Sequence, residues 1–184
     1  MTPKHSLALS TYLQSTKAPW TSLLVVTDGK RAESLVRPPT GFALKVIRGR
    51  HCKTPANLFA EFARALEFPD YFGHNWDALE ECLADLEWLP AKGYILLVTN
   101  AEGVLPEDEE EYETFLEILR DAGEAWGNGQ AGMGARRATP FHALFVVSEQ
   151  EKANRAHWGM KEINAEPTRA ANRQQRSPNR RPSR

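Results

Sequence analysis

Three apolar runs and three amphipathic stretches set the pattern of the central part of the chain. Residues 42–47 alternate apolar and polar side chains, residues 93–99 are almost continuously apolar, and residues 141–147 form a third strong run. These runs predict strands, the second of them covered on both faces. Between and around them, apolar residues recur at helical spacing. The helices predicted from this spacing are residues 54–66, 75–86 and 107–126.

The starts of the first two predicted helices carry clear local signals. Thr54-Pro55 places a hydroxyl N-cap before a proline at the first helical position, and Asn75 can cap the second helix. The predicted order is strand, helix, helix, strand, helix, strand. Strands that alternate with helices favour parallel pairing through right-handed crossovers. We therefore predict an α/β fold with a small parallel β-sheet and packed helices.

The N-terminal flank, residues 1–40, is less regular. An apolar run at residues 21–27 is followed by Asp28-Gly29 and then by residues 31–37, which also contain apolar positions. Asp-Gly between two such runs is a strong turn signal, so the sequence predicts an extra N-terminal β-hairpin. Residues 1–40 are accordingly treated as an extension of the central domain, which spans residues 41–148.

The C-terminal flank, residues 149–184, loses the pattern of the central domain. A short helix is expected within residues 149–163. From Pro167 onward the chain contains six arginines and no acidic residue, a composition that cannot bury a core and predicts disorder. We interpret residues 149–184 as a basic, largely disordered tail. A solvated tail, weak contact with nucleic acid, and folding back onto an acidic surface of the same chain are alternative roles for it.

Charge is distributed very unevenly, although the formal net charge of the whole chain is only −1. Residues 61–124 hold 18 of the 24 acidic residues and three of the 23 basic ones, which gives this segment a net charge of −15. The remainder carries +14. The near-zero total argues against a uniformly basic nucleic-acid-binding protein, and the asymmetry within the chain bears on its partners rather than on its fold.

Several function classes are disfavoured by the remaining composition. Cys52 and Cys82 are too few for a disulfide framework, and neither they nor the five histidines show the spacing of a metal site. No apolar run approaches the roughly 20 residues that span a bilayer, and residues 1–10 show no secretion signal. We expect a cytoplasmic, monomeric protein with no cofactor, no metal and no enzymatic activity.

The densest constellation of unusual residues is the segment 68–83, FPDYFGHNWDALEECL. It resembles the hallmark segment of the barstar family, the intracellular inhibitors of secreted bacterial ribonucleases. That pattern runs Pro, acid, Tyr, aromatic, Gly, any residue, Asn, apolar, Asp-Ala-Leu, acid, Cys and Leu. The resemblance covers about residues 42–148, including the order of strands and helices. It implies that the loop and the helix after it enter the active-site cleft of a basic ribonuclease or related toxin.

The resemblance also implies which residues meet the partner. Tyr71 lies in the loop, Asp77 in the first turn of the helix, and Glu81 one turn later, where the family has an aspartate. Asp121 matches an acid late in the following helix. The family inhibitor has Trp at the position of Glu80 and Thr at that of Ala84, so an aromatic anchor is replaced by a charge. The expected partner-binding residues are Tyr71, Gly73, Asn75, Asp77, Glu80, Glu81, Ala84 and Asp121.

Elementary electrostatics supports the same surface. Asp77 and Glu81 are four residues apart and share a helix face with Glu80, so their mutual repulsion requires solvent or a cationic partner. Carboxylates can mimic substrate phosphates in a cleft lined by Arg, Lys and His. A solvated helix face is the plain alternative, and a module that binds another basic protein is a second one. His74 lies near these acids, but no nucleophile is placed with it, and Cys82 falls on the apolar stripe.

Overall fold

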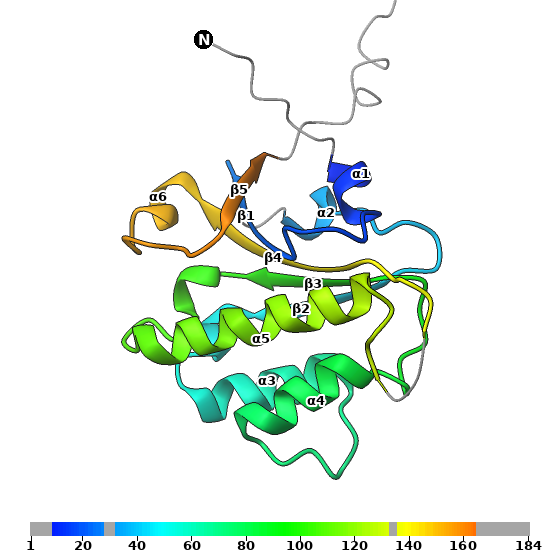
Figure 1. The fold of residues 1–184 in the computed structure, drawn as a ribbon. Coiled ribbons are helices and arrows are strands. Elements are labelled where there is room, and N and C mark those ends of the chain that lie inside the picture. Colours follow the sequence, from blue (N-terminus) through cyan, green and yellow to red (C-terminus); the bar gives the residue numbers. More distant parts are fainter. Residues whose placement is uncertain (1–8, 28–31, 133–135, 165–184) are drawn as a thin grey trace, which may run out of the picture.

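The computed structural model describes residues 9–27, 32–132 and 136–164. Five parallel strands form one sheet in the order β2-β3-β4-β1-β5 (Figure 1). The strands are β1 Thr21–Val26, β2 Ala43–Arg48, β3 Tyr94–Thr99, β4 Phe141–Ser148 and β5 Lys161–Asn164. The helices are α1 Leu9–Leu13, α2 Ala32–Leu35, α3 Pro55–Leu66, α4 Trp76–Asp85, α5 Glu109–Gly127 and α6 Glu149–Lys152, with 3₁₀ turns η2 Gly49–His51 and η3 Ala101–Gly103.

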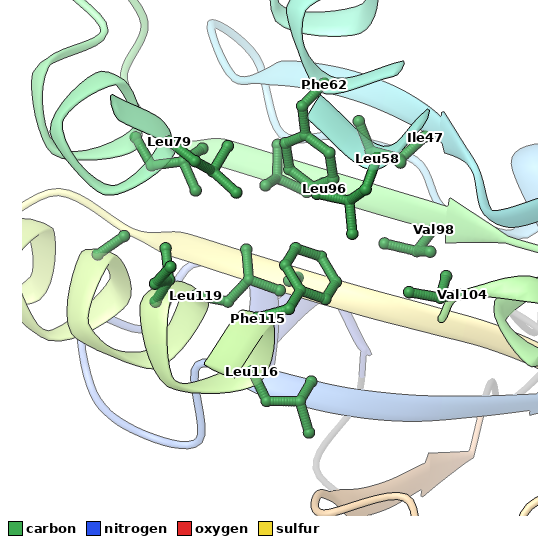
Figure 2. Close-up of a cluster of buried hydrophobic side chains, with 14 of the residues drawn as sticks. Ile47, Leu58, Phe62, Leu79, Leu96, Val98, Val104, Phe115, Leu116 and Leu119 are labelled. Atoms are coloured by element: carbon green, nitrogen blue, oxygen red, sulfur yellow. The ribbon is translucent and has the colours of Figure 1, made fainter. Parts of the chain in front are cut away.

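The sheet separates two apolar clusters of unequal size. The larger cluster lies between the sheet and α3, α4 and α5, where Leu58, Phe62, Leu79 and Phe115 meet Leu96 (Figure 2). The smaller cluster lies on the opposite face of the sheet. It is formed by Tyr12, Leu13, Leu24, Val26, Val36, Ile95, Leu97, Leu144 and Val146. Because both faces of the central strands are covered, the continuous apolar run of β3 is buried, as the sequence predicted.

The α/β class, the parallel sheet and the order from β2 to β4 are confirmed. The Thr54 hydroxyl accepts a hydrogen bond from the Asn57 amide at 3.3 Å, with Pro55 at the first helical position. On α5 the N-cap is Asp108, whose side chain accepts from the Glu111 amide. Local capping chemistry therefore fixed these boundaries to within one or two residues of the predicted ones.

The predicted N-terminal hairpin is wrong. Residues 21–26 do form a strand, but β1 pairs in parallel with β4 on one side and β5 on the other, and Ala32–Leu35 is helical. Asp28-Gly29 lies outside the described residues. The physical reason is burial: Leu23 faces the larger cluster and Leu24 the smaller one, so β1 needs cover on both faces, which a two-stranded hairpin on the surface cannot give.

The C-terminal flank also differs from its prediction. The helix expected within residues 149–163 is only the single turn of α6, and Lys161–Asn164 adds an edge strand next to β1. The Arg-rich segment from Pro167 onward lies outside the described residues. Within the part of the chain that the structure describes, no helix is long and apolar enough to cross a membrane.

Candidate functional site

One face of helix α4 packs against the core, and the opposite face is exposed. Its N-cap is Asn75, whose side-chain oxygen accepts a hydrogen bond from the Ala78 amide at 2.8 Å. Leu79, Cys82 and Leu83 are buried against the core, which fixes the rotation of the helix. The residues between them on the helical wheel must then point outward. Those outward residues are Asp77, Glu80 and Glu81, all exposed.

The loop before α4 is anchored by aromatic packing, and this leaves Tyr71 projecting. Phe72 is buried, with ring centroids 4.8 Å from Phe68 and 6.4 Å from Phe59, both edge to face. Its neighbour Tyr71 is 73% exposed. A large aromatic ring held out in water by a rigid loop loses little conformational entropy on binding, so Tyr71 is suited to a protein interface.

Gly73 and His74 shape the turn that leads into the helix. A Cβ on Gly73 would lie 3.3 Å from the Asn75 side-chain nitrogen and 3.4 Å from the Ala78 Cβ, so a larger residue would press on the N-cap. His74 has a φ of 52°, in the left-handed region. Its ring lies 4.7 Å from that of Phe72. Gly73 and Asn75 thus support the conformation of the surface.

Trp76 belongs to the packed side of the helix. Its ring lies edge to face with Phe59 at 4.8 Å, and its Nε1 donates a hydrogen bond of 2.7 Å to Glu111 on α5. The side chain is half-buried against the larger apolar cluster. Trp76 ties the start of α4 to α5 and is not available as an aromatic anchor for a partner.

Some acidic residues on and just after α4 are paired with a cation, and others are not. Among the described residues, Asp77, Glu80 and Glu81 form no ion pair. At the other end of the helix, Arg136 binds Asp85 at 3.3 Å and Glu87 at 3.0 Å. Negative charge is therefore left unbalanced over the first two turns of α4.

The structure brings seven of the eight predicted residues together on one loop and one helix, which we call the loop–helix surface: Tyr71, Gly73, Asn75, Asp77, Glu80, Glu81 and Ala84. Ala84 is half-buried on α4. Asp121 lies elsewhere: it is exposed on α5 and lines a hollow bounded by residues 18–21 and 159–161. No other predicted residue lines that hollow, so a role for Asp121 at this surface stays a prediction.

The thiol of Cys82, on the buried side of α4, is not an activated nucleophile. Cys82 is 5% exposed, and burial, followed by the charges of Asp85 and Glu81, raises the pKa of its thiol to about 11. The thiol is therefore protonated at neutral pH and shielded from substrate. This arrangement can bind a cationic surface but offers no activated nucleophile.

Sequence reasoning missed a cluster of charges on the other side of α3. Glu61 was counted with the unbalanced acids, yet it is 4% exposed and its carboxylate accepts hydrogen bonds from both Arg48 and Arg64. These hydrogen bonds hold the pKa of Glu61 well below its usual range, although burial alone would raise it. The three-residue spacing of Glu61 and Arg64 was the one signal of this cluster in the sequence.

Comparison with known proteins agrees with the fold and with the segment around α4. The comparison with curated proteins finds no match to the chain. The family model described as Barstar (barnase inhibitor) matches residues 42–146, which is more than half of the 184 residues and runs from β2 into β4. The matched region contains the whole loop–helix surface, whereas α1, β1, α2, α6 and β5 lie outside it. The chain belongs to the barstar family.

Proposed function

We propose that the protein is an intracellular inhibitor that binds and occludes the active site of a basic ribonuclease or a related toxin. The observation that carries this proposal is the loop–helix surface. Three exposed carboxylates of α4 form no ion pair among the described residues, and the loop before the helix carries an exposed tyrosine, within a domain of a family described as an inhibitor of barnase. A nuclease cleft that binds RNA phosphates offers the cations that these carboxylates lack.

The proposed mechanism is steric and electrostatic. Asp77 and Glu81 occupy the places of substrate phosphates and pair with basic side chains of the cleft, while Tyr71 packs against its rim. The unbalanced charge at the start of α4 also speeds the encounter, an effect for which the barnase–barstar pair is itself the reference example. No bond is made or broken in the partner, so the protein acts as a binder and not as an enzyme.

A second candidate function is an interaction module that keeps the barstar fold but binds a different basic protein. Glu80 favours it, because this exposed acid stands where the family inhibitor has a tryptophan. Without that aromatic anchor, the surface relies more on charge and less on apolar burial. Ala84 is a second difference on the same face. It is half-buried, and it lacks the hydroxyl of the threonine that the family inhibitor has at this position.

The test is an RNA-cleavage assay with barnase and other small basic secreted ribonucleases, titrated with the purified chain. An inhibitor should abolish cleavage at a ratio of one to one. Asp77→Ala and Glu81→Ala should each weaken inhibition well over tenfold, which corresponds to more than about 1.4 kcal/mol. Binding without inhibition would favour the interaction module, and full inhibition by the Asp77→Ala/Glu81→Ala double variant would refute the site.

We also propose that the protein acts as a monomer in the cytoplasm. An intracellular location keeps an inhibitor apart from a secreted nuclease until the nuclease threatens the producing cell. Buried cysteines suit a reducing compartment, since Cys52 and Cys82 are both free thiols. Light scattering of the free protein and cell fractionation test these two statements separately.

A further inference from the structure

A basic hollow of about 680 Å³ lies outside the loop–helix surface. It is formed where β2 ends, at η2 and along the outer side of α3. Its polar lining is almost entirely cationic, and no aromatic side chain except a histidine contributes to it. The cationic and polar residues that line it, apart from Glu61, are Arg48, Arg50, His51, Lys53, Asn57 and Arg64.

Glu61 fixes two of these cations in place. Arg48 donates to its carboxylate through Nε at 2.9 Å and Nη2 at 2.6 Å, and Arg64 donates through Nε at 3.0 Å and Nη2 at 2.7 Å. The Arg48 amide adds a fifth hydrogen bond at 2.9 Å. One buried carboxylate thus orients two guanidinium groups. It leaves the Nη1 group of each without a partner among the described residues, while their side chains stay 37% and 49% exposed.

Two further cations in the hollow have no acidic partner among the described residues. Arg50 and Lys53 are exposed and form no ion pair within the described part of the chain. The position of Arg50 is rigid, because the neighbouring Gly49 packs so closely on residues 99–100 that a Cβ would clash with their carbonyl oxygens. Four formal positive charges therefore surround one buried negative charge, and the hollow attracts anions.

We propose that this hollow binds the phosphate backbone of single-stranded RNA without reading its bases. Guanidinium groups whose position is fixed by a carboxylate are preorganised donors for phosphate oxygens. The cations lie at both ends of the hollow. Lys53 directly precedes the N-cap of α3, whereas Arg64 lies nine residues after the first residue of the helix, an axial rise of about 14 Å at 1.5 Å per residue. A single phosphate cannot reach both ends, so a strand with consecutive phosphates fits the hollow better than a lone phosphate.

The lining of the hollow bears on how a strand would bind. It lacks the Phe, Tyr and Trp side chains on which bases stack, so it offers affinity for the backbone and no sequence preference. An acidic peptide is the alternative polyanion, and competition by polyglutamate distinguishes it from RNA. The proposal does not depend on nuclease inhibition, because none of the residues of the loop–helix surface lines the hollow.

The test is fluorescence polarisation of a short labelled oligouridylate or oligoadenylate with the full chain. The variant Arg50→Glu/Lys53→Glu is compared with the matched control Arg37→Glu/Arg137→Glu, whose positions are exposed outside the hollow. Both variants keep the Arg-rich tail and change the net charge equally. An acid at residue 53 also favours the N-terminus of α3, so folding should be retained, as circular dichroism will show.

We expect the hollow variant to weaken binding of both oligonucleotides about tenfold or more and the control less than threefold. Between about 50 and 200 mM salt, the slope of log affinity against log salt should fall by about 1.4 for the two lost phosphate contacts. Equal weakening by both variants would overturn the proposal. So would a strong preference for one base, or competition by polyglutamate at the concentration at which unlabelled RNA competes.

Discussion

The most informative stability prediction concerns Glu61, because a single substitution removes a charge on which two arginines depend. Glu61→Gln keeps the size of the side chain and one of its acceptor oxygens but removes the negative charge. Removing one partner of a buried ion pair costs about 3–5 kcal/mol. Arg48 and Arg64 are 37% and 49% exposed and can be rehydrated, so the cost should lie lower, at about 2–3 kcal/mol.

The matched control is Glu67→Gln at the C-cap of the same helix. Glu67 also pairs with a cation, Lys45, at 2.8 Å, but its side chain is 74% exposed. An exposed pair of this kind contributes about 0–1 kcal/mol. Urea unfolding followed by circular dichroism should therefore separate the two variants by at least about 1 kcal/mol. For a chain of this size, Glu61→Gln should lower the Tm by about 4–12 °C.

The pH dependence of unfolding checks the cause of that difference. The folded protein holds the pKa of Glu61 below its ordinary value of 4.5. The stabilisation that the ionised carboxylate provides is therefore complete above pH 4.5. It is lost as the pH falls toward the pKa of the folded state, because the wild-type carboxyl then becomes protonated. The gap between wild type and Glu61→Gln should shrink below about pH 4. An effect equal to that of Glu67→Gln, or a gap that does not change in acid, would refute the argument.

Three further predictions concern other parts of the molecule. Asn75→Ala should lower the free energy of unfolding by about 1 kcal/mol through the lost N-cap, whereas Asn75→Asp should not; urea denaturation distinguishes them. Tyr71→Ala should change stability by less than about 0.5 kcal/mol. It should nevertheless weaken nuclease binding by about 2 kcal/mol, measured by calorimetry. Burial lowers the pKa of His142. Below about pH 6.5, the His142 imidazole therefore binds a proton in the unfolded chain but not in the folded one. Stability should then fall by up to about 1.4 kcal/mol per pH unit, and His142→Gln should remove this slope; an identical slope in the variant would contradict the assignment.

Most of the central fold could be predicted because its signals are local. The caps at Thr54 and Asn75 and the helical spacing of apolar residues act within a few positions, and the structure confirms α3, α4 and α5. The placement of β1 could not be predicted in this way. Its partners β4 and β5 lie more than 100 residues along the chain, and the turn signal at Asp28-Gly29 contains no information about them.

At the candidate site, too, the local signals were predictable from sequence and the long-range pairing was not. The spacing of Asp77, Glu80 and Glu81 on a helix predicts their common face, and burial of Leu79 and Leu83 turns that face outward. The sum of −15 over residues 61–124 was less informative, because it treated every acid alike. Glu61, Glu67, Asp85, Glu87 and Glu109 are each paired with a cation in the folded protein. Apart from the pair of Glu61 and Arg64, these ion pairs join residues more than ten positions apart in sequence, and they appear only in the folded structure.

The central claim is that the uncompensated carboxylates at the start of α4 bind a basic nuclease. It is tested most directly by the dissociation constant of the nuclease complex for the conservative double variant Asp77→Asn/Glu81→Gln. The matched control is Glu117→Gln/Glu124→Gln, which removes the same charge from exposed positions on α5. We predict that the site variant binds more than about 100-fold more weakly, which corresponds to about 2.7 kcal/mol, and the control less than about threefold. Equal affinities for the two variants would contradict the proposed site.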